Sequence, residues 1–208
     1  MIEATPLHLI EEPRFGELLL QSGALLNAKD KYGWTPLIRA VYNQNLEIVN
    51  FLIENGADLE AKNIHGYPAV CICENVYIME PLILAGADVT IADRDRQTPF
   101  YKFFRLCREA KLLDHNFDIN SFLPVLQRML YSGGYVMTQI NEENALHVSL
   151  AVASELGASP AFIWLLTNFK LLILLCAFRS VFGFGKNSHF HYLPKEIVCL
   201  IVQRLKTI

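Results

Sequence analysis

Apolar residues along this chain of 208 residues fall into short blocks, and polar segments that contain glycine separate the blocks. In the clearest block, the apolar residues between positions 48 and 53 cover a broad face of one helix. Thr35 and Pro36 precede this block and suit the start of an earlier helix, because threonine caps a helix and proline fits its first turn. Gly56 follows the block and suits a helix end, where a left-handed residue is needed. The pattern therefore predicts a pair of helices bounded by Thr-Pro and by glycine.

The same block recurs along the chain at a fixed period. Gly23 and Gly56 lie 33 positions apart, as do Asp30 and Asn63, and the string 86–93 continues the pattern. A fixed period of this length is typical of repeat proteins, in which one supersecondary unit is copied along the chain. We therefore expect stacked repeats, each of which contacts its neighbours, in place of one central core.

The strings G-W-T-P-L at 33–37 and I-V-N-F-L-I-E-N-G-A-D at 48–58 resemble the ankyrin repeat. The resemblance implies an all-α fold: an ankyrin-repeat solenoid of about five helix-turn-helix units with β-hairpin loops, followed by a C-terminal helical cap. We expect the repeats to occupy residues 1–168 and the C-terminal helical segment to occupy residues 169–208. The predicted units are about 5–30, 31–63, 64–93, 94–141 and 142–168.

Spacing within the units predicts where they differ. The first and third units are shorter than the second between the start of the first helix and the closing glycine, so each is expected to lack about one helical turn. The fourth unit is longer, and we expect its first helix to extend to Leu113, with a loop at 114–120 and with Ser121 capping the next helix. Pro81 falls within the second helix of the third unit, where it is expected to kink that helix or delay its start.

Composition narrows the class of protein. Apolar residues make up 52% of the chain, which is enough for a buried core. The net charge of −3 is uneven, because residues 170–208 hold six Lys or Arg and one acidic residue. We interpret this basic tail as the solvated edge of a helical cap and expect no nucleic-acid partner. The uncharged apolar run 171–178 is too short to span a bilayer, so no membrane span is predicted.

Candidate chemistry does not favour an enzyme. His8 and His147 match the histidine of the ankyrin Thr-Pro-Leu-His motif, and the resemblance implies that such imidazoles satisfy backbone groups between repeats. His189 and His191 lack accompanying cysteine or carboxylate ligands, so we expect no metal site. The five cysteines show no C-x-x-C spacing and are expected to be reduced and buried. Without a phosphate loop, nucleophile elbow or dinucleotide fingerprint, we predict a non-catalytic protein with no cofactor.

The resemblance also implies where a partner would bind. In ankyrin-like arrays the hairpin tips and the exposed side of the first helices vary to suit the partner, and exposed aromatic residues are the usual anchors. The predicted partner-binding residues are Lys31, Tyr32, Trp34, Tyr42, Asn43, Ile64, His65, Tyr67, Arg94, Asp95 and Gln97.

The C-terminal forty residues admit three interpretations. The string L-P-K-E-I at 193–197, followed by Ile201 and Leu205, resembles the first helix of an F-box, which in ankyrin proteins of poxviruses and intracellular bacteria recruits host ubiquitin ligases. Leu172 and Cys176 match instead the spacing of a SOCS-box helix. In the third interpretation these helices only cap the solenoid, and the apolar face of the last helix is buried. In the F-box interpretation the ligase-docking residues are Leu193, Pro194, Glu196, Ile197 and Ile201.

Two functions follow from these patterns. The leading prediction is a protein–protein interaction scaffold that binds its partner through the hairpin tips and the concave face. The alternative is a substrate adaptor, such as a pathogen effector, whose C-terminus recruits a ubiquitin-ligase subunit. In both cases we expect a cytoplasmic monomer, which would act in the host cytosol if it is a secreted effector.

Overall fold

The computed structural model describes residues 4–93, 97–132 and 142–167, and within these ranges it contains helices, turns and loops but no strand. The chain divides into two compact units that separate after Ala158. The helices of the first unit are η1 (Pro6–Leu9), α1 (Pro13–Gln21), α2 (Pro36–Tyr42), α3 (Leu46–Glu54), α4 (Ala69–Ile72), α5 (Val76–Ala85), α6 (Pro99–Leu113), η2 (Ile119–Phe122), α7 (Leu123–Tyr131) and α8 (Glu142–Glu155).

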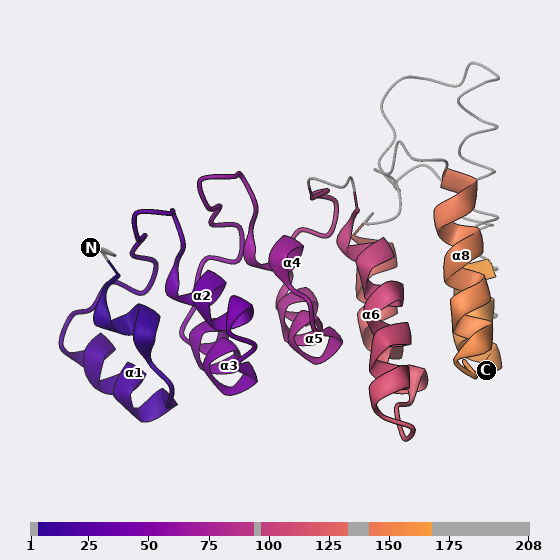
Figure 1. Cartoon of the computed structure of the whole chain (residues 1–208), viewed down its shortest axis with the longest axis horizontal. Coiled ribbons are helices and arrows are strands. Elements are labelled where there is room, and N and C mark those ends of the chain that lie inside the picture. The colour runs from indigo at the N-terminus through magenta and orange to yellow at the C-terminus, as the bar shows by residue number, and fades with distance from the viewer. Residues whose placement is uncertain (1–3, 94–96, 133–141, 168–208) are drawn as a thin grey trace, which may run out of the picture. The chain divides into compact units, whose positions relative to one another are not determined.

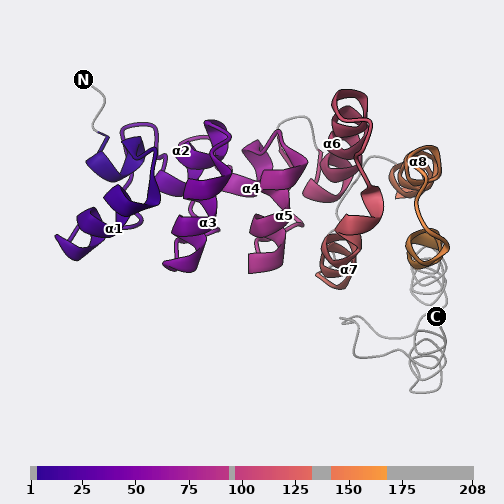
Figure 2. The same cartoon turned by 90° about the horizontal axis from the view of Figure 1, so that it is seen from below.

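Helix pairs stack side by side in the first unit. Figure 2 shows α1, α3, α5 and α7 in one row and α2, α4, α6 and α8 in the other. In the row of second helices, α3 packs on α1 and α5, and α5 packs on α7. In the row of first helices, α2 packs on α4, and α6 packs on α8. The loops ahead of α2 and α4 project to the same side of the helices (Figure 1). The predicted solenoid of helical hairpins is confirmed by this arrangement.

Short polar side chains set the helix starts. The hydroxyls of Thr35 and Thr98 accept hydrogen bonds from the third residue of α2 and of α6, at 3.3 and 3.5 Å. Asn45 and Asn75 cap α3 and α5 in the same way, with distances of 3.1 and 2.9 Å. Because the first backbone N–H groups of a helix have no partner inside it, each cap satisfies one of them. The predicted Thr-Pro helix starts are confirmed.

The expected differences in unit length fall on the first helices. The four residues of η1 and the four of α4 replace the seven of α2, so the missing turn lies in the first helix of units one and three. The second helices keep their length, and the delayed start expected from Pro81 is wrong. Asn75 caps α5 eleven positions before Gly86, the same spacing that separates Asn45 from Gly56.

The insertion in the fourth unit folds back onto the helices. Helix α6 reaches Leu113 as expected, and Phe117 from the following loop stacks on Phe122 with ring centres 5.6 Å apart. Phe122 in turn lies 5.8 Å from the ring of Tyr77 on α5 and 5.9 Å from the ring of Phe103 on α6. The insertion therefore adds an aromatic cover over units three and four.

Ser121 does not cap the next helix, contrary to the sequence prediction. It lies inside η2, where its hydroxyl donates to the carbonyl of Asp118 at 2.8 Å. The carboxylate of Asp118 provides the cap by accepting from the N–H of Asn120 at 2.9 Å. A carboxylate is the stronger acceptor for a free N–H, so the turn starts three residues earlier than the serine indicated.

The second compact unit is described only at its beginning. Residues 160–167 are helical, and the hydroxyl of Ser159 accepts from the N–H of Phe162 at 3.3 Å. The predicted Ser-Pro helix start is confirmed. The predicted C-terminal helical segment, 169–208, lies outside the described residues, and the repeat boundaries proposed from the sequence stay predictions.

Candidate protein-binding surface

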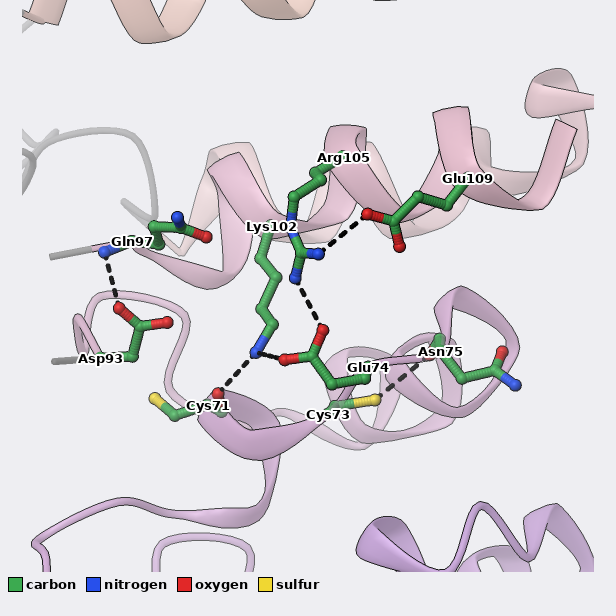
Figure 3. A network of polar contacts seen from close by, with 9 residues as sticks. All are labelled: Cys71, Cys73, Glu74, Asn75, Asp93, Gln97, Lys102, Arg105 and Glu109. Carbon is green, nitrogen blue, oxygen red and sulfur yellow. Dashed lines mark hydrogen bonds and ion pairs between the residues drawn. The ribbon is translucent and has the colours of Figure 1, made fainter. Parts of the chain in front are cut away.

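An acidic or amide side chain organises each hairpin turn. Oδ1 of Asp30 accepts from the backbone N–H groups of Tyr32 and Trp34, at 2.8 and 2.9 Å. In the next unit Oδ1 of Asn63 accepts from His65 and Tyr67 at 2.9 and 3.1 Å. A third turn follows the same rule, because Oδ1 of Asp93 accepts from the N–H of Gln97 at 2.9 Å (Figure 3). These side chains mimic a backbone turn and hold the hairpin shape.

The hairpins of units two and three are bonded to each other. The N–H of Ile64 donates to the carbonyl of Tyr32 at 3.0 Å, and Nζ of Lys29 donates to the carbonyl of Lys62 at 3.0 Å. Gly33 permits this approach, since a Cβ at that position would lie 2.9 Å from the nitrogen of Ile64. The two tips therefore form one continuous surface fixed by backbone contacts.

Most of the predicted binding residues that the structure describes are exposed. Lys31, Tyr32, Ile64 and His65 are exposed at the tips, and Tyr42 and Asn43 are exposed at the end of α2. The remaining three described residues are half-buried: Trp34, Tyr67 and Gln97. Arg94 and Asp95 lie outside the described residues.

Trp34 is held by its own unit. Its ring lies 4.8 Å from that of Tyr42 in an edge-on arrangement, and the guanidinium of Arg39 lies over it at 4.6 Å. Arg39 also forms an ion pair with the buried carboxylate of Asp30 at 3.1 Å. Trp34 therefore supports the hairpin, while Tyr42 presents the exposed part of this cluster. The sequence prediction omitted Arg39, because its partners Asp30 and Trp34 lie outside α2 and no helical spacing marks the contacts.

A network of charged groups joins units three and four (Figure 3). The side chain of Lys102 on α6 is only 5% exposed, and its Nζ lies 2.9 Å from the carbonyl of Cys71 and 2.5 Å from Glu74. Arg105 binds the other oxygen of Glu74 at 2.7 Å and binds Glu109 at 2.9 Å. The charged side chains of Lys102 and Arg105 on α6 therefore have acidic partners within the protein. The end of α2 and the hairpin tips lie outside this network and keep exposed side chains.

Electrostatics support a structural role for this network. Partial burial alone would raise the pKa of Glu74, but the hydrogen bonds and charges of Lys102 and Arg105 outweigh burial and leave the pKa below its ordinary value. The ion pairs are therefore present at neutral pH and are lost as the pH falls through the lowered pKa of Glu74. Burial raises the pKa of the nearby thiols, that of Cys71 to about 12 and that of Cys73 to about 11. These thiols stay protonated at neutral pH and are poor nucleophiles.

His8 has the structural role that the sequence predicted. Its Nδ1 accepts from the N–H of Thr5 at 3.1 Å, and Nε2 therefore carries the proton and donates to the carbonyl of Trp34 at 2.9 Å. The imidazole thus ties unit one to the hairpin of unit two. His147, His189 and His191 are not among the side chains that the structure describes.

The described part of the chain contains neither a metal-ligand cluster nor a helix that could span a membrane. No group of three or more His, Cys, Asp or Glu residues is arranged there to hold a metal ion. Within the same ranges no helix has the length and apolar character needed to cross a membrane. The predicted ligase-docking residues, 193–201, lie outside the described residues.

Known proteins share these repeats. A family model for ankyrin repeats in three copies matches residues 3–63. An ankyrin repeat protein of Rickettsia bellii is 45% identical over 60 residues, which cover 28% of this chain and 17% of that protein. An ankyrin repeat-containing protein of Schizosaccharomyces pombe is 32% identical over 77 residues, 36% of this chain and 37% of that protein. An ankyrin repeat protein of variola virus is 29% identical over 96 residues, 40% of this chain and 17% of that protein. The matches thus span at most 37% of the length of these three relatives.

Capped helix pairs, stacked in two rows and joined by tightly organised hairpin turns, define a helical repeat protein. Residues 3–63 match ankyrin repeats, and the stacked arrangement of the later helix pairs is consistent with the same kind of repeat. Ankyrin repeats generally mediate protein–protein interaction, and proteins of this kind are typically non-catalytic.

Proposed function

We propose that this chain is a non-catalytic binding module that holds a partner protein on the hairpin tips and first helices of units two and three. The exposure of Tyr42 and Ile64, each 61% accessible, carries this proposal. Large apolar side chains that stay exposed on a rigid scaffold are typical anchors of protein interfaces. The hydrogen bonds that join the two tips support the proposal as well, because a surface that is already ordered loses little entropy when it binds.

A second candidate function is a substrate adaptor, which the L-P-K-E-I string at 193–197 favours. In this version the repeats hold a target while the C-terminus docks on a ubiquitin-ligase subunit. With either function, the protein would act in the cytoplasm, or in a host cytosol if it is secreted.

Capture from a eukaryotic lysate separates the two functions. The full chain and a chain that lacks residues 170–208 are immobilised side by side, and the proteins retained on each are identified. We expect the same partner on both chains, because the proposed surface lies in units two and three. Ligase subunits retained by the full chain alone would favour the adaptor. If neither chain retains a specific protein, the proposed binding function is wrong.

Once a partner is purified, alanine substitutions locate its binding surface. Tyr42→Ala and Ile64→Ala should each weaken the affinity by up to about 2 kcal/mol, roughly 30-fold in Kd, if the residue is central in the interface. Phe15→Ala is the matched control, since Phe15 is a large apolar residue on α1 that is 55% exposed. Calorimetry should show a change in Kd of less than about twofold for the control. If all three substitutions change the Kd equally, the partner does not bind at the proposed surface.

A further inference from the structure

The hairpin tips of units two and three share one sign of charge. The tip surface consists of Lys29, Lys31, Tyr32, Lys62, Ile64 and His65, all of which are exposed. Nζ of Lys31 lies 4.9 Å from the ring centre of Tyr32, and Nζ of Lys29 reaches across to the next hairpin. No ion pair of the described residues involves any of these three lysines.

The acidic side chain in these turns already has partners within the protein. Asp30 is the one carboxylate in the segments 29–34 and 62–67, and it is buried and committed to two backbone N–H groups and to Arg39. The corresponding position of the next hairpin turn is neutral, since it holds Asn63. Glu60, which precedes the second tip, accepts from the backbone N–H of Asp88 at 2.7 Å in the loop of the next unit. The lysines of the tip surface are therefore without an acidic partner in their own turns.

Apolar side chains lie among these lysines. Tyr32 is 44% exposed and is bonded through its carbonyl to the N–H of Ile64, so the two side chains belong to adjoining backbone segments. A ligand that matches this surface carries negative charge together with at least one apolar group. Proteins offer that combination in acidic segments that contain an aliphatic or aromatic residue.

Nucleic acid matches the surface less well. Domains that bind nucleic acid usually have a strongly basic isoelectric point and neutralise several phosphates along a groove. This chain has an isoelectric point of about 6.1, and the second helices α1 and α3 expose Glu17, Glu47 and Glu54. A long polyanion would meet repulsion there, whereas a short acidic segment can stay on the tips.

We propose that the tip surface binds an acidic segment of the partner protein and that an apolar residue of this segment contacts Tyr32 and Ile64. The inference rests on the proposed binding function and names the chemistry of the partner.

Selection from a phage-displayed library of random peptides on the immobilised full chain tests this inference. The selected peptides are synthesised, and their affinity is measured for the natural chain, for the double variant Lys31→Glu/Lys62→Glu and for Arg128→Glu. Arg128 is the control because it is an exposed cation on α7, away from the tips. A single-stranded DNA oligonucleotide is measured alongside.

Selected peptides should be rich in Asp and Glu and should contain an apolar residue. The double variant should bind them at least about tenfold more weakly at low salt, and the difference should shrink at high salt. Arg128→Glu should change the affinity by less than about twofold. Circular dichroism of the double variant should match that of the natural chain, because both lysines are exposed.

Four outcomes would overturn the inference. Peptides without an acidic excess, or with unchanged affinity for the double variant, would show that the tips do not select by charge. Failure to select any peptide would also exclude an acidic-segment site, while capture of a partner from lysate would still test the proposed binding function separately. Tighter binding of the oligonucleotide through Lys31 and Lys62 would assign the surface to nucleic acid.

Discussion

At the scale of single residues, the same helix caps, closing glycines and turn-forming side chains recur from repeat to repeat. Threonine or asparagine caps a helix, glycine closes it, and Asp30, Asn63 or Asp93 shapes the next turn. Gly33 adds a feature of its own, because its left-handed backbone, with φ +70°, lies against the backbone of the following hairpin. The distance between the two tips therefore depends on the absence of a side chain at this position.

Gly33→Ala should destabilise the protein more than a comparable substitution at an open site. An alanine in the left-handed region costs about 1–2 kcal/mol, and at position 33 its Cβ would also lie too close to backbone atoms of Asn63 and Ile64. Gly56→Ala is the control, since Gly56 has φ +82° and nothing within 4 Å of the added Cβ. Urea denaturation should show an extra loss of at least about 1 kcal/mol for Gly33→Ala. Equal losses would mean that the hairpins do not depend on this close approach.

At the scale of the elements, differences between repeats lie in the first helices and the polar links. Helix α4 is short and α6 is long, while α3 and α5 keep the same spacing from cap to closing glycine. Both helices of a unit contribute to the core; on the second helix α3, Leu52 is fully buried, and α3 packs on α1 and α5. Units three and four are joined in addition by Lys102, Arg105 and Glu74.

Leu52→Ala should lower the free energy of unfolding by about 2–5 kcal/mol, because a fully buried leucine leaves a cavity when it is truncated. Leu18→Ala is the control, since Leu18 is exposed on α1 and its loss should change stability by less than about 0.5 kcal/mol. Urea denaturation followed by circular dichroism measures both. A loss below about 1 kcal/mol for Leu52→Ala would contradict the burial described for α3.

The sequence predicted the features that each repeat specifies locally. Thr-Pro starts, closing glycines and the length of α6 follow from the chemistry of single turns, so the repeating pattern was enough to find them. Contacts between units were not predictable, because Lys102 and Cys71 lie 31 positions apart and the units differ in length. Lys29 and Lys62 were missed for a similar reason: their shared surface exists only once the two hairpins are bonded together.

At the scale of the whole molecule, the described repeats bury one set of residues and expose another, which we propose as the binding surface. First and second helices together bury the core, and Lys102 and Arg105 of α6 are paired within the array. The tips of units two and three and the end of α2 keep exposed aromatic, apolar and basic side chains. The central claim is that a partner protein binds to this second set of residues.

Hydrogen–deuterium exchange of the full chain, with and without the partner captured from lysate, tests this claim most directly. Binding should slow the exchange of backbone amides in the segments 31–34, 42–44 and 64–67, because a bound partner covers these turns and restricts their opening. Amides of α3 and α5 should exchange at nearly unchanged rates. Protection confined to α3 and α5, with unchanged exchange at the hairpin tips, would contradict the account.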